Sequence, residues 1–496
     1  GFQVNGPSTN SSFGFTVASA GDVNDDGFAD IIIGASTQFV FGPANYNGQT
    51  YVIHGTATGA IIRSGTGNSD LMRGGEFNDS LTGLDGNDTL RGNDGADTLT
   101  GGGGNDSLEG GGGADSLVGG IGFDFASYAG ATAAVTVNLL SGTATGGAGT
   151  DALNGVEGVI GSAFADSLTG SAVNDVLEGG AGADTLNGGA GTADVARYTG
   201  GAVRLFADAP AFNAGHALGD VLTGIERYDF AGVTGVVTYY GGAGGDWMVG
   251  GSGNDLIWGN AGNDTLDGGG GNDFMMSGDG ADSILGGAGF DAVYYGDSAV
   301  AISINLATGV HSGFAAGDSF TSIESFLMTE QGDTVIGADV GGTGDIIYGL
   351  GGADSLSGQR GFDWLIGGDG DDTLTGGFGF DYLSGGAGAD RFVYLDAQDG
   401  GNAPGETIID FTAGTDKIAF TGASMGLAGL TLGQNLIIAA GGPSGTGGTT
   451  TGTTVIYDST AGQVWIDTNG NQAGGLVQLV NLFGAPVLTA ADFMVI

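Results

Sequence analysis

Aspartate recurs at every ninth residue over long stretches of this 496-residue chain. Read in nines from Gly65, the sixth position of each unit is aspartate and the eighth is mostly leucine. Carboxylate oxygens are hard ligands that suit Ca²⁺ in loops. Glycine and aspartate also form good turns, but turn formation alone does not explain a carboxylate at one fixed position in nine. The spacing therefore predicts a series of oxygen-only cation sites.

The nonapeptide forms four blocks. The aspartates predicted to bind metal are Asp70, Asp79, Asp88, Asp97, Asp106, Asp115 and Asp124 in the first block, Asp166, Asp175 and Asp184 in the second, Asp246, Asp255, Asp264, Asp273, Asp282 and Asp291 in the third, and Asp345, Asp354, Asp363, Asp372, Asp381 and Asp390 in the fourth. Phe77 and Val173 replace the fourth-position glycine of two units, and Thr192-Ala193 lengthens the turn before Asp194. These departures weaken the prediction at Asp79, Asp175 and Asp194.

The elements that position these aspartates are a turn and a short strand. Glycines in the first six positions permit positive φ angles, and the last three positions are long enough only for a very short strand. One such strand cannot bury its apolar residue alone, so the units must stack. Two turns and two strands would make a coil of 18 residues, with successive turns ~4.8 Å apart. We therefore expect an all-β solenoid.

Composition narrows the function. The chain has 111 glycines, no cysteine, and 56 acidic against 9 basic residues, giving a net charge of −47. Such a charge disfavours binding to nucleic acid or anionic membranes, and no apolar run is long enough to span a bilayer. Of the acids, 48 are Asp and 8 are Glu. Halophilic adaptation would enrich both, so the ratio favours metal binding.

The nonapeptide resembles the RTX (hemolysin-type calcium-binding) repeat, GGxGxDxUx, over roughly 230 residues. The resemblance implies a right-handed parallel β-roll or β-helix solenoid, with Ca²⁺ held between turns by the sixth-position Asp and by turn carbonyls. It also implies about n − 2 ions for n repeats. Blocks of 7, 4, 6 and 6 repeats then predict about 15 Ca²⁺ ions as the cofactor.

The segments between blocks also repeat. Each block ends with a tyrosine four residues after its last Asp, and short alternating strands follow the first three. Glu157, Glu226 and Glu324 recur at one place in these segments. They are calcium ligands or structural residues, and the sequence leaves both interpretations open. We expect the segments to be broader β-helical joints.

The two ends carry other patterns. Residues 22–30 read D-x-N-x-D-G-x-x-D, so Asp22, Asn24, Asp26 and Asp30 are predicted calcium ligands. With Phe13-Gly14 and Gly34-Ala35, this stretch resembles an FG-GAP repeat. Because one such blade cannot close a propeller, we expect a processed or truncated chain, or docking of this unit elsewhere. From Ala389 onward the sequence resembles the C-terminal region of RTX proteins exported by type I secretion, ending in an acid and four apolar residues.

The expected domains follow these patterns. They are an FG-GAP-like unit (1–62), RTX block 1 (63–127), a β joint (128–160), RTX block 2 (161–198), a β joint (199–240), RTX block 3 (241–295), a β joint (296–340), RTX block 4 (341–391) and a C-terminal β cap with the secretion signal (392–496).

No catalytic motif stands out. His54, His216 and His311 form no H-E-x-x-H pair, and the G-x-S-x-G match at 422–426 lacks a later histidine. We therefore expect a non-enzymatic, extracellular or cell-surface structural protein: an adhesin, surface-layer or filament component. Its expected partners are calcium, the type I secretion apparatus, and a second copy or a matrix partner. The alternative is the calcium-dependent folding and secretion module of a larger exported enzyme.

Overall fold

A computed structural model describes residues 12–21, 30–36, 49–53, 59–338, 344–396, 399, 405–421, 425, 436–439, 453–468 and 475–496. The protein is all-β, with 49% strand and 2% helix. The described helices are the 3₁₀ turns η1 (Pro210–Phe212), η2 (Gly313–Ala315) and η3 (Ala490–Asp492). In the described ranges, no helix is long and apolar enough to cross a membrane. The chain forms two compact units, one of Gly1–Tyr198 with Pro210–Tyr228 and one of Thr199–Ala209 with Asp229–Ile496.

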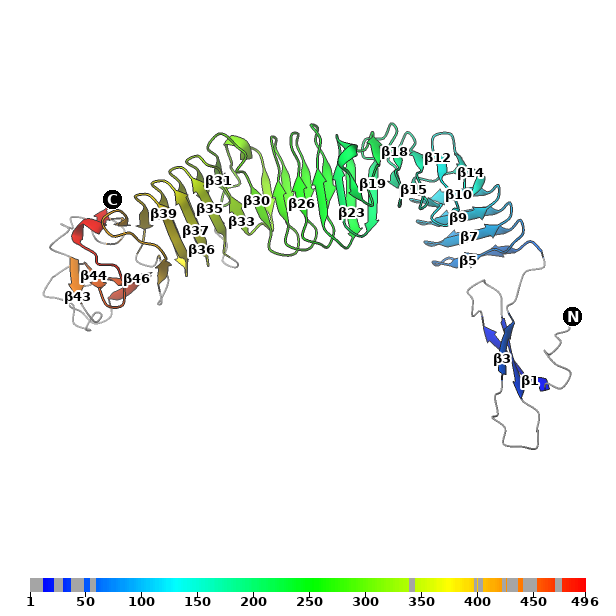
Figure 1. Ribbon diagram of the computed structural model, residues 1–496, viewed down its shortest axis with the longest axis horizontal. Coiled ribbons are helices and arrows are strands. Elements are labelled where there is room, and N and C mark those ends of the chain that lie inside the picture. The colour runs from blue at the N-terminus through cyan, green and yellow to red at the C-terminus, as the bar shows by residue number, and fades with distance from the viewer. Residues whose placement is uncertain are drawn as a thin grey trace. The chain divides into compact units, whose positions relative to one another are not determined.

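The first unit begins with a small antiparallel sheet. Its strands are β1 (Ser12–Gly21), β2 (Asp30–Ser36) and β3 (Gln49–Ile53), in the order β1-β2-β3 (Figure 1). Of the predicted ligands in this region, Asp30 begins β2. Asp22, Asn24 and Asp26 lie outside the described residues.

The rest of the first unit is built from two rows of stacked strands. One row is β4 (Ile62–Ser64), β6 (Ser80–Asp85), β8 (Thr98–Gly103), β10 (Ser116–Ile121), β14 (Gly149–Asn154), β13 (Thr143–Gly146), β12 (Val135–Asn138), β16 (Ser167–Thr169), β18 (Thr185–Asn187) and β22 (Val221–Thr223). The other is β5 (Leu71–Arg73), β7 (Thr89–Asp94), β9 (Ser107–Gly112), β11 (Phe125–Ser127), β15 (Gly158–Ile160), β17 (Val176–Glu178) and β19 (Val195–Gly200).

Within the rolls the strands are parallel and repeat every 18 residues. Leu81 pairs with Leu99 and Leu99 with Leu117, and all three side chains are fully buried. The strand's middle residue therefore fills the core between the two sheets, as the nonapeptide predicts. The parallel β-roll solenoid expected from the sequence is confirmed.

The first joint departs from simple wider coils. β12, β13 and β14 pair antiparallel, and β12 then pairs parallel with β16. The chain reverses between β13 and β14 at Gly146 and Gly149, whose φ angles are 125° and 113°. Glycine allows this reversal because it has no Cβ. The joint is thus a β-meander inserted between two parallel coils of the same sheet.

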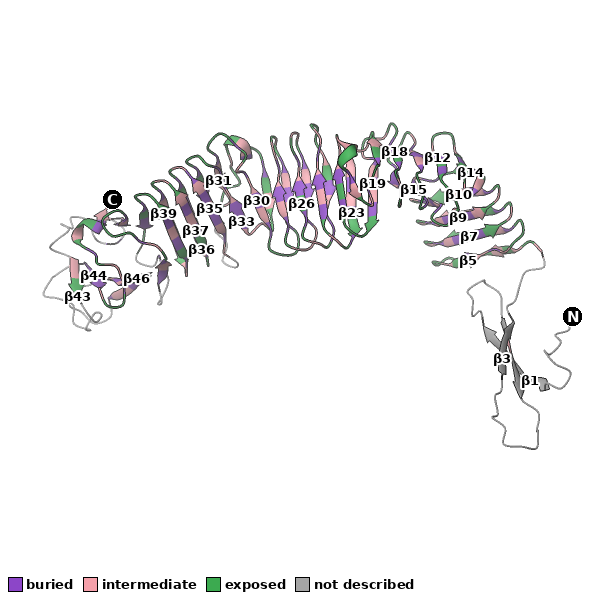
Figure 2. Cartoon of the chain, in the orientation of Figure 1, coloured by how far each residue is buried: buried purple, intermediate pink, exposed green. Residues whose placement is uncertain are grey.

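The second unit repeats the architecture. One sheet runs β20 (Val203–Phe206), β24 (Val237–Tyr240), β26 (Leu256–Trp258), β28 (Phe274–Met276), β30 (Ala292–Tyr294), β33 (Ser325–Leu327), β35 (Ile346–Gly351), β37 (Trp364–Asp369), β39 (Tyr382–Ala387), β41 (Glu406–Ile408), β46 (Leu476–Leu482), β45 (Gln463–Asp467), β44 (Thr454–Asp458) and β43 (Leu436–Ala439). Around β26 the buried residues lie in the middle of each strand (Figure 2).

The opposite side of the second unit has two groups of strands. The first is β25 (Trp247–Val249), β27 (Thr265–Asp267), β29 (Ser283–Leu285) and β32 (Ser319–Thr321). The second is β31 (Ser303–Asn305), β34 (Thr334–Ile336), β36 (Ser355–Gly361), β38 (Thr373–Gly379), β40 (Arg391–Tyr394), β42 (Lys417–Phe420) and β47 (Phe493–Val495). The remaining strands are β21 (Ala214–Gly215) and β23 (Arg227–Val233).

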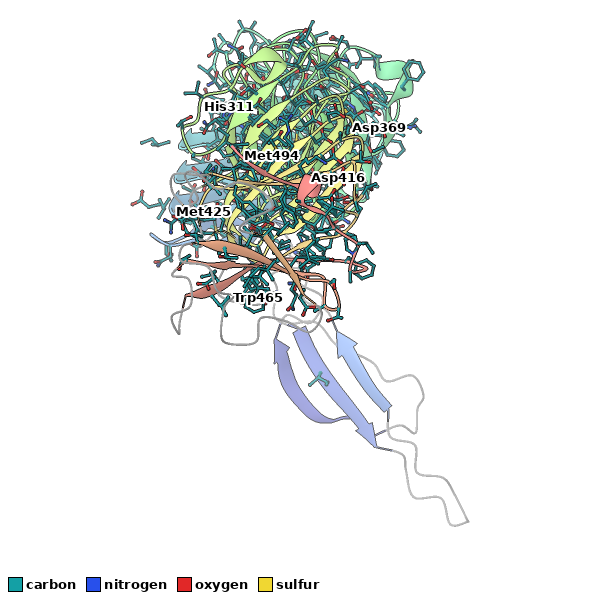
Figure 3. All side chains as sticks on the ribbon, turned by 90° about the vertical axis from the view of Figure 1, so that its left-hand side faces the viewer. His311, Asp369, Asp416, Met425, Trp465 and Met494 are labelled. Carbon is teal, nitrogen blue, oxygen red and sulfur yellow. The ribbon has the colours of Figure 1, made fainter. Side chains whose placement is uncertain are left out.

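The C-terminal part changes from parallel to antiparallel pairing. β44, β45 and β46 form an antiparallel group, and Trp465 lies in its central strand (Figure 3). β47, which contains Met494, returns to pair parallel with β42. The last strand of the chain is therefore part of the solenoid's sheet rather than a free tail.

Candidate calcium sites in the turns

Most repeat aspartates use one carboxylate oxygen to accept a backbone N–H of the coil before them. Asp106 Oδ1 accepts the backbone N–H of Asp88 at 2.8 Å, and Asp124 Oδ1 accepts that of Asp106 at 2.8 Å. In the second unit Asp381 Oδ1 accepts the N–H of Asp363 at 2.8 Å. These aspartates thus form columns in which a side chain caps the aspartate one coil earlier.

The second oxygen is buried without a hydrogen-bond partner in most turns. Among the described residues this is true of Oδ2 in sixteen repeat aspartates: Asp88, Asp97, Asp106, Asp115, Asp124, Asp184, Asp194, Asp264, Asp273, Asp282, Asp291, Asp354, Asp363, Asp372, Asp381 and Asp390. Fifteen of them are predicted ligands, and the remaining one is Asp194. We call these turns open.

The other turns are closed by their own backbone. The second-position N–H donates to Asp Oδ2 in the turn of Asp70 (from Thr66, 2.6 Å) and in that of Asp246 (from Gly242, 2.7 Å). The closed turns contain the predicted ligands Asp70, Asp79, Asp166, Asp175, Asp246, Asp255 and Asp345, together with Asp333. In these turns the ion would compete with an N–H for the same oxygen.

A backbone angle separates the two kinds of turn. Every open turn has a positive φ at its second position, including non-glycine residues such as Leu84 (86°), Asn260 (71°) and Leu350 (70°). This left-handed conformation costs a non-glycine residue roughly 1–2 kcal/mol, and such strain concentrates at functional positions. The second positions of the closed turns are absent from the positive-φ residues.

Stacking explains which turns are open. The third-position N–H of a stacked turn donates to the second-position carbonyl one coil earlier, as from Asp94 to Gly75 (3.2 Å) and from Asp279 to Asn260 (2.7 Å). The closed turns have no nonapeptide turn one coil earlier in the sequence, whereas every open turn has one. The open conformation therefore depends on a nonapeptide turn one coil earlier, whether that earlier turn is itself open or closed.

The first-position glycine leaves room for an ion cradle. A Cβ built on Gly83 or Gly101 would lie closer than van der Waals contact to Oδ2 of its own turn's aspartate and to the first-position carbonyl one coil later. The missing Cβ thus lets a carboxylate and a carbonyl of adjacent turns converge. In the described part of the chain no three His, Cys, Asp or Glu side chains gather as a metal site. Backbone carbonyls of neighbouring turns are available as further oxygen ligands.

Burial makes these carboxylates costly when they are charged and unpaired. It raises the pKa of Asp363 to about 7; the N–H of Asp345 opposes the rise, and the charges of Asp381 and Asp345 add to it. Burial likewise raises the pKa of Asp273 and Asp354 to about 7. Like charges stacked in a column repel each other, and oxygen-only donor sets suit Ca²⁺. Calcium would supply the missing positive charge.

The joint glutamates take the place of a repeat aspartate. Glu157 Oε2 accepts the N–H of Asp124 at 3.1 Å, and Glu324 Oε2 accepts that of Asp291 at 2.9 Å. Glu226 does the same for Asp194 at 2.9 Å. Each glutamate therefore caps the last aspartate of the block that precedes its joint, which gives these glutamates at least a structural role.

The joints also contain aspartates that sequence reasoning missed. Asp151, Asp220 and Asp318 accept the N–H of the next-to-last repeat aspartate of their block. Tyr295 donates to Asp318 Oδ2 at 2.5 Å and Tyr198 to Asp220 Oδ2 at 3.1 Å. In these joints the tyrosine hydroxyl occupies the oxygen that is unpaired in an open turn. Two sequence features could have indicated these aspartates. Each follows a glycine by one or two residues in the recurring joint segments that start at 149, 219 and 317, and each joint is preceded by a tyrosine four residues after the last repeat Asp.

Two further acids extend the fourth block. Asp333 precedes the predicted block and accepts the N–H of Ile302, while its own N–H donates to Asp354. At the other end Asp416 accepts the N–H of Asp390 at 3.2 Å. Asp333 sits at the sixth position of an imperfect nonapeptide without glycine at positions one to four, so the repeat pattern alone did not include it.

We expect Asp106→Asn to weaken calcium-induced folding while preserving the column. Asparagine keeps an oxygen for the N–H of Asp88 but replaces the ion-facing Oδ2 with an NH₂ group. Loss of one ion bound at ~100 times its Kd would cost ~2.7 kcal/mol. Asp106→Ala should cost a further 1–3 kcal/mol, roughly, by leaving that N–H unpaired. The measurement is the calcium midpoint by circular dichroism.

Asp85→Asn is the matched control, since Asp85 is exposed in a neighbouring turn and the substitution changes the charge equally. Equal midpoints for the Asp106 and Asp85 variants would contradict the assignment of Asp106 Oδ2 to an ion.

We expect Tyr295→Phe to destabilise the second unit by roughly 1–3 kcal/mol. Burial raises the pKa of Asp318 to about 6, and the Tyr295 hydroxyl lowers it. Without that donor the buried carboxylate loses a partner, so the pKa should rise further and the deficit should grow between pH 5 and pH 8. Urea unfolding in calcium at several pH values measures it. Tyr294→Phe removes a half-buried hydroxyl next door and should have little effect; equal losses in both variants would argue against the Tyr295–Asp318 pair.

Three stretches of the chain match known families. The RTX calcium-binding nonapeptide repeat matches residues 64–99, 91–126, 160–192, 240–275 and 268–297. The C-terminal region of serralysin, of peptidase family M10, matches residues 335–495. The FG-GAP repeat matches residues 13–53.

Solved structures that match the chain include part of an epimerase. The solution structure of the AlgE6R3 subunit from the Azotobacter vinelandii mannuronan C5-epimerase is 28% identical, covers 33% of this chain and 78% of its own, and has a TM-score of 0.15. No curated protein matches the chain significantly. The family matches confirm the three resemblances read from the sequence. This chain therefore carries RTX calcium-binding nonapeptide repeats between an FG-GAP repeat and a serralysin-type C-terminal region.

Proposed function

We propose that this protein is a non-enzymatic structural component outside the cell, an adhesin, surface-layer or filament protein, that folds and self-associates on binding Ca²⁺. RTX repeats and a serralysin-type secretion region indicate an exported calcium-binding protein. The observation that supports the proposal most is the set of sixteen unpaired buried carboxylate oxygens, which recur one coil apart in both units. Their number implies that the solenoid itself is the functional element.

Calcium would act as the cohesive element of the fold. We propose about one ion per open turn, near the about 15 ions that the repeat count implies. Each ion that binds only the folded chain adds RT ln(1 + [L]/Kd), or ~2.7 kcal/mol at 100-fold saturation. About 15 ions would also add about +30 to the charge of −47 and leave about −17. The chain would remain unfolded where Ca²⁺ is scarce and fold after export.

A second candidate is a folding and secretion module of a larger exported enzyme. Its support is the match of residues 335–495 to the C-terminal region of a peptidase. The intact mass of the protein secreted into culture medium distinguishes the two. A mass near 48.4 kDa without catalytic activity supports the structural protein. A much larger product with a catalytic domain preceding Gly1 supports the module.

Electron microscopy of the purified chain tests self-assembly. We expect filaments or sheets in millimolar Ca²⁺ that disappear in excess EGTA. Isolated particles under both conditions would count against a structural role through self-association. Polymers that persist in EGTA would show that calcium is not the cohesive element.

A further inference from the structure

One outer face of the second unit is lined by large apolar side chains. In the sheet β24-β26-β28-β30-β33-β35-β37-β39 a central residue of each strand is buried, and the flanking residues face outward, as in β26 and β37, except Ser325 of β33, which is buried. The outward residues include Tyr240, Trp258, Tyr294, Tyr348, Trp364 and Tyr382. Trp364 and Tyr382 pair with each other in a row two residues before that of Tyr348. We call these outward residues together the aromatic face.

The fold does not require this composition. The corresponding outward positions on the opposite side of the unit are mostly Ser and Thr, as in β36 (Ser355 and Ser357) and β38 (Thr373 and Thr375). Those strands have the same buried leucines and the same repeat register. Because Ser and Thr serve the roll equally well, the large side chains of the aromatic face need another explanation. Their outward position indicates contact with a partner.

The aromatic face is also free of charge. In each strand of this sheet from β24 to β39, neither the buried central residue nor the two residues that flank it are Asp, Glu, Lys or Arg. The chain as a whole has 56 acidic residues. The carboxylates Asp369 and Asp371 instead occupy an exposed turn beside it. The exposed carboxylate Asp297 lies beside Trp258 and Tyr294 at the edge of the face. Most surfaces of this protein would repel a second copy, whereas two aromatic faces would meet with charges only at the edges of the contact.

Ring geometry restricts what binds there. Tyr240 stacks on Phe206 with centroids 4.1 Å apart and on Trp258 at 4.3 Å, with interplanar angles of 8° and 11°. These rings cover each other's faces and turn their edges outward. Ligands that stack, such as bases, need an open ring face. At this end the face presents ring edges. A shallow hollow of about 150 Å³ opens beside Trp258 and Tyr294, with Phe314 of η2 at its wall. An apolar partner surface can cover both.

We propose that the aromatic face is the surface through which two copies of this chain associate, sheet against sheet. Two apolar sheet faces pack ~10 Å apart in β-sandwiches, and the same face on both copies gives a closed twofold dimer. Eight strands of three residues span roughly 34 by 10 Å. Two copies would bury roughly 700 Å² in total, below the ~1,000 Å² of a stable interface, so the association would be weak and reversible. This inference rests on the proposed self-association and assigns it a surface.

Sedimentation velocity of the calcium-loaded chain at about 1–100 µM tests it. We expect a concentration-dependent dimer for the wild type, and at least tenfold weaker association for the triple variant Trp258→Thr, Trp364→Thr, Tyr382→Thr. Trp364 and Tyr382 are 44% and 43% exposed, and threonine is common at the equivalent positions. Trp247→Thr is the control, because Trp247 is 43% exposed in β25, on the opposite side of the unit. Circular dichroism checks that each variant folds in calcium. If the triple variant does not fold, the single variant Trp364→Thr is used in its place.

The outcomes separate this inference from the proposed function. Association of the triple variant as strong as that of the wild type would place self-association on another surface and overturn the aromatic face. A wild type that stays monomeric at 100 µM would exclude a second copy as the partner of the aromatic face. Dimers through this face without any larger assembly by microscopy would support the face but contradict a filament or surface-layer role.

Discussion

Removal of calcium is expected to unfold both units of this protein. Each unit is held by columns of buried aspartates whose Oδ2 atoms have no hydrogen-bond partner, and a charge buried without a partner costs several kcal/mol. Each short strand contributes only about one core residue, such as Leu99 or Leu365, so no single coil buries enough apolar surface to hold itself together. Without the ions, repulsion within each column should exceed the hydrophobic gain.

A calcium titration followed by far-UV circular dichroism measures this effect. We expect a coil spectrum in EGTA and a β spectrum in millimolar Ca²⁺, with a cooperative transition because an open turn needs a turn one coil earlier. Mg²⁺ at the same concentration is the control and should be much less effective, since it prefers a smaller octahedral site with retained waters. A β spectrum that is unchanged in EGTA would show that the ions are not required for the fold.

The calcium-free chain is expected to gain structure as the pH falls from about 7.5 to about 4. Burial raises the pKa of Asp273, Asp354 and Asp363 to about 7 and that of Asp97 and Asp184 to about 6, each from 3.8. A raised pKa means that the folded state binds the proton more tightly than the unfolded state does. Protonation therefore stabilises the fold, fully below about 3.8, and this stabilisation is lost as the pH rises through 6 to 7.

Each such group contributes on the order of a few kcal/mol across this range. Circular dichroism in EGTA, or urea unfolding at each pH, detects the change. With calcium present, the fold should instead lose stability as the pH falls, because protons compete with Ca²⁺ for the same carboxylate oxygens. The triple variant Asp273→Asn, Asp354→Asn, Asp363→Asn should show a smaller pH effect in EGTA. A calcium-free chain that loses structure between pH 7 and pH 4 would contradict the assignment of these buried carboxylates.

Much of the repeat architecture could be predicted from the sequence. The period of nine places one carboxylate and one apolar residue at fixed points of each unit, and stacking follows because a three-residue strand cannot bury Leu81 or Leu99 alone. The matches to the RTX repeat, the serralysin C-terminal region and the FG-GAP repeat agree with the motifs read from the chain. The ligand roles of Asp22, Asn24, Asp26 and Asp30 remain predictions from their spacing.

The contacts of the joint residues could not be predicted from the sequence. Glu157, Glu226 and Glu324 stood out as a recurrence, but their hydrogen bonds to repeat aspartates span 32 or 33 residues. Asp151, Asp220 and Asp318 act over 36 residues, twice the length of a coil. No local sequence pattern predicts which coil a joint residue will hydrogen-bond to. The antiparallel β12–β13–β14 meander was unexpected for the same reason.

The sequence by itself determined the chemistry of this protein: a carboxylate in every turn, a glycine beside it, and an apolar residue for the core, because these are properties of one nonapeptide. Only the tertiary structure decided which turns are open. Leu84 and Leu350 adopt a left-handed backbone where a turn stacks on an earlier turn, whereas Thr66 closes its turn onto Asp70. The physical reason is that whether Oδ2 stays unpaired depends on the neighbouring coil, 18 residues away, as much as on its own residue.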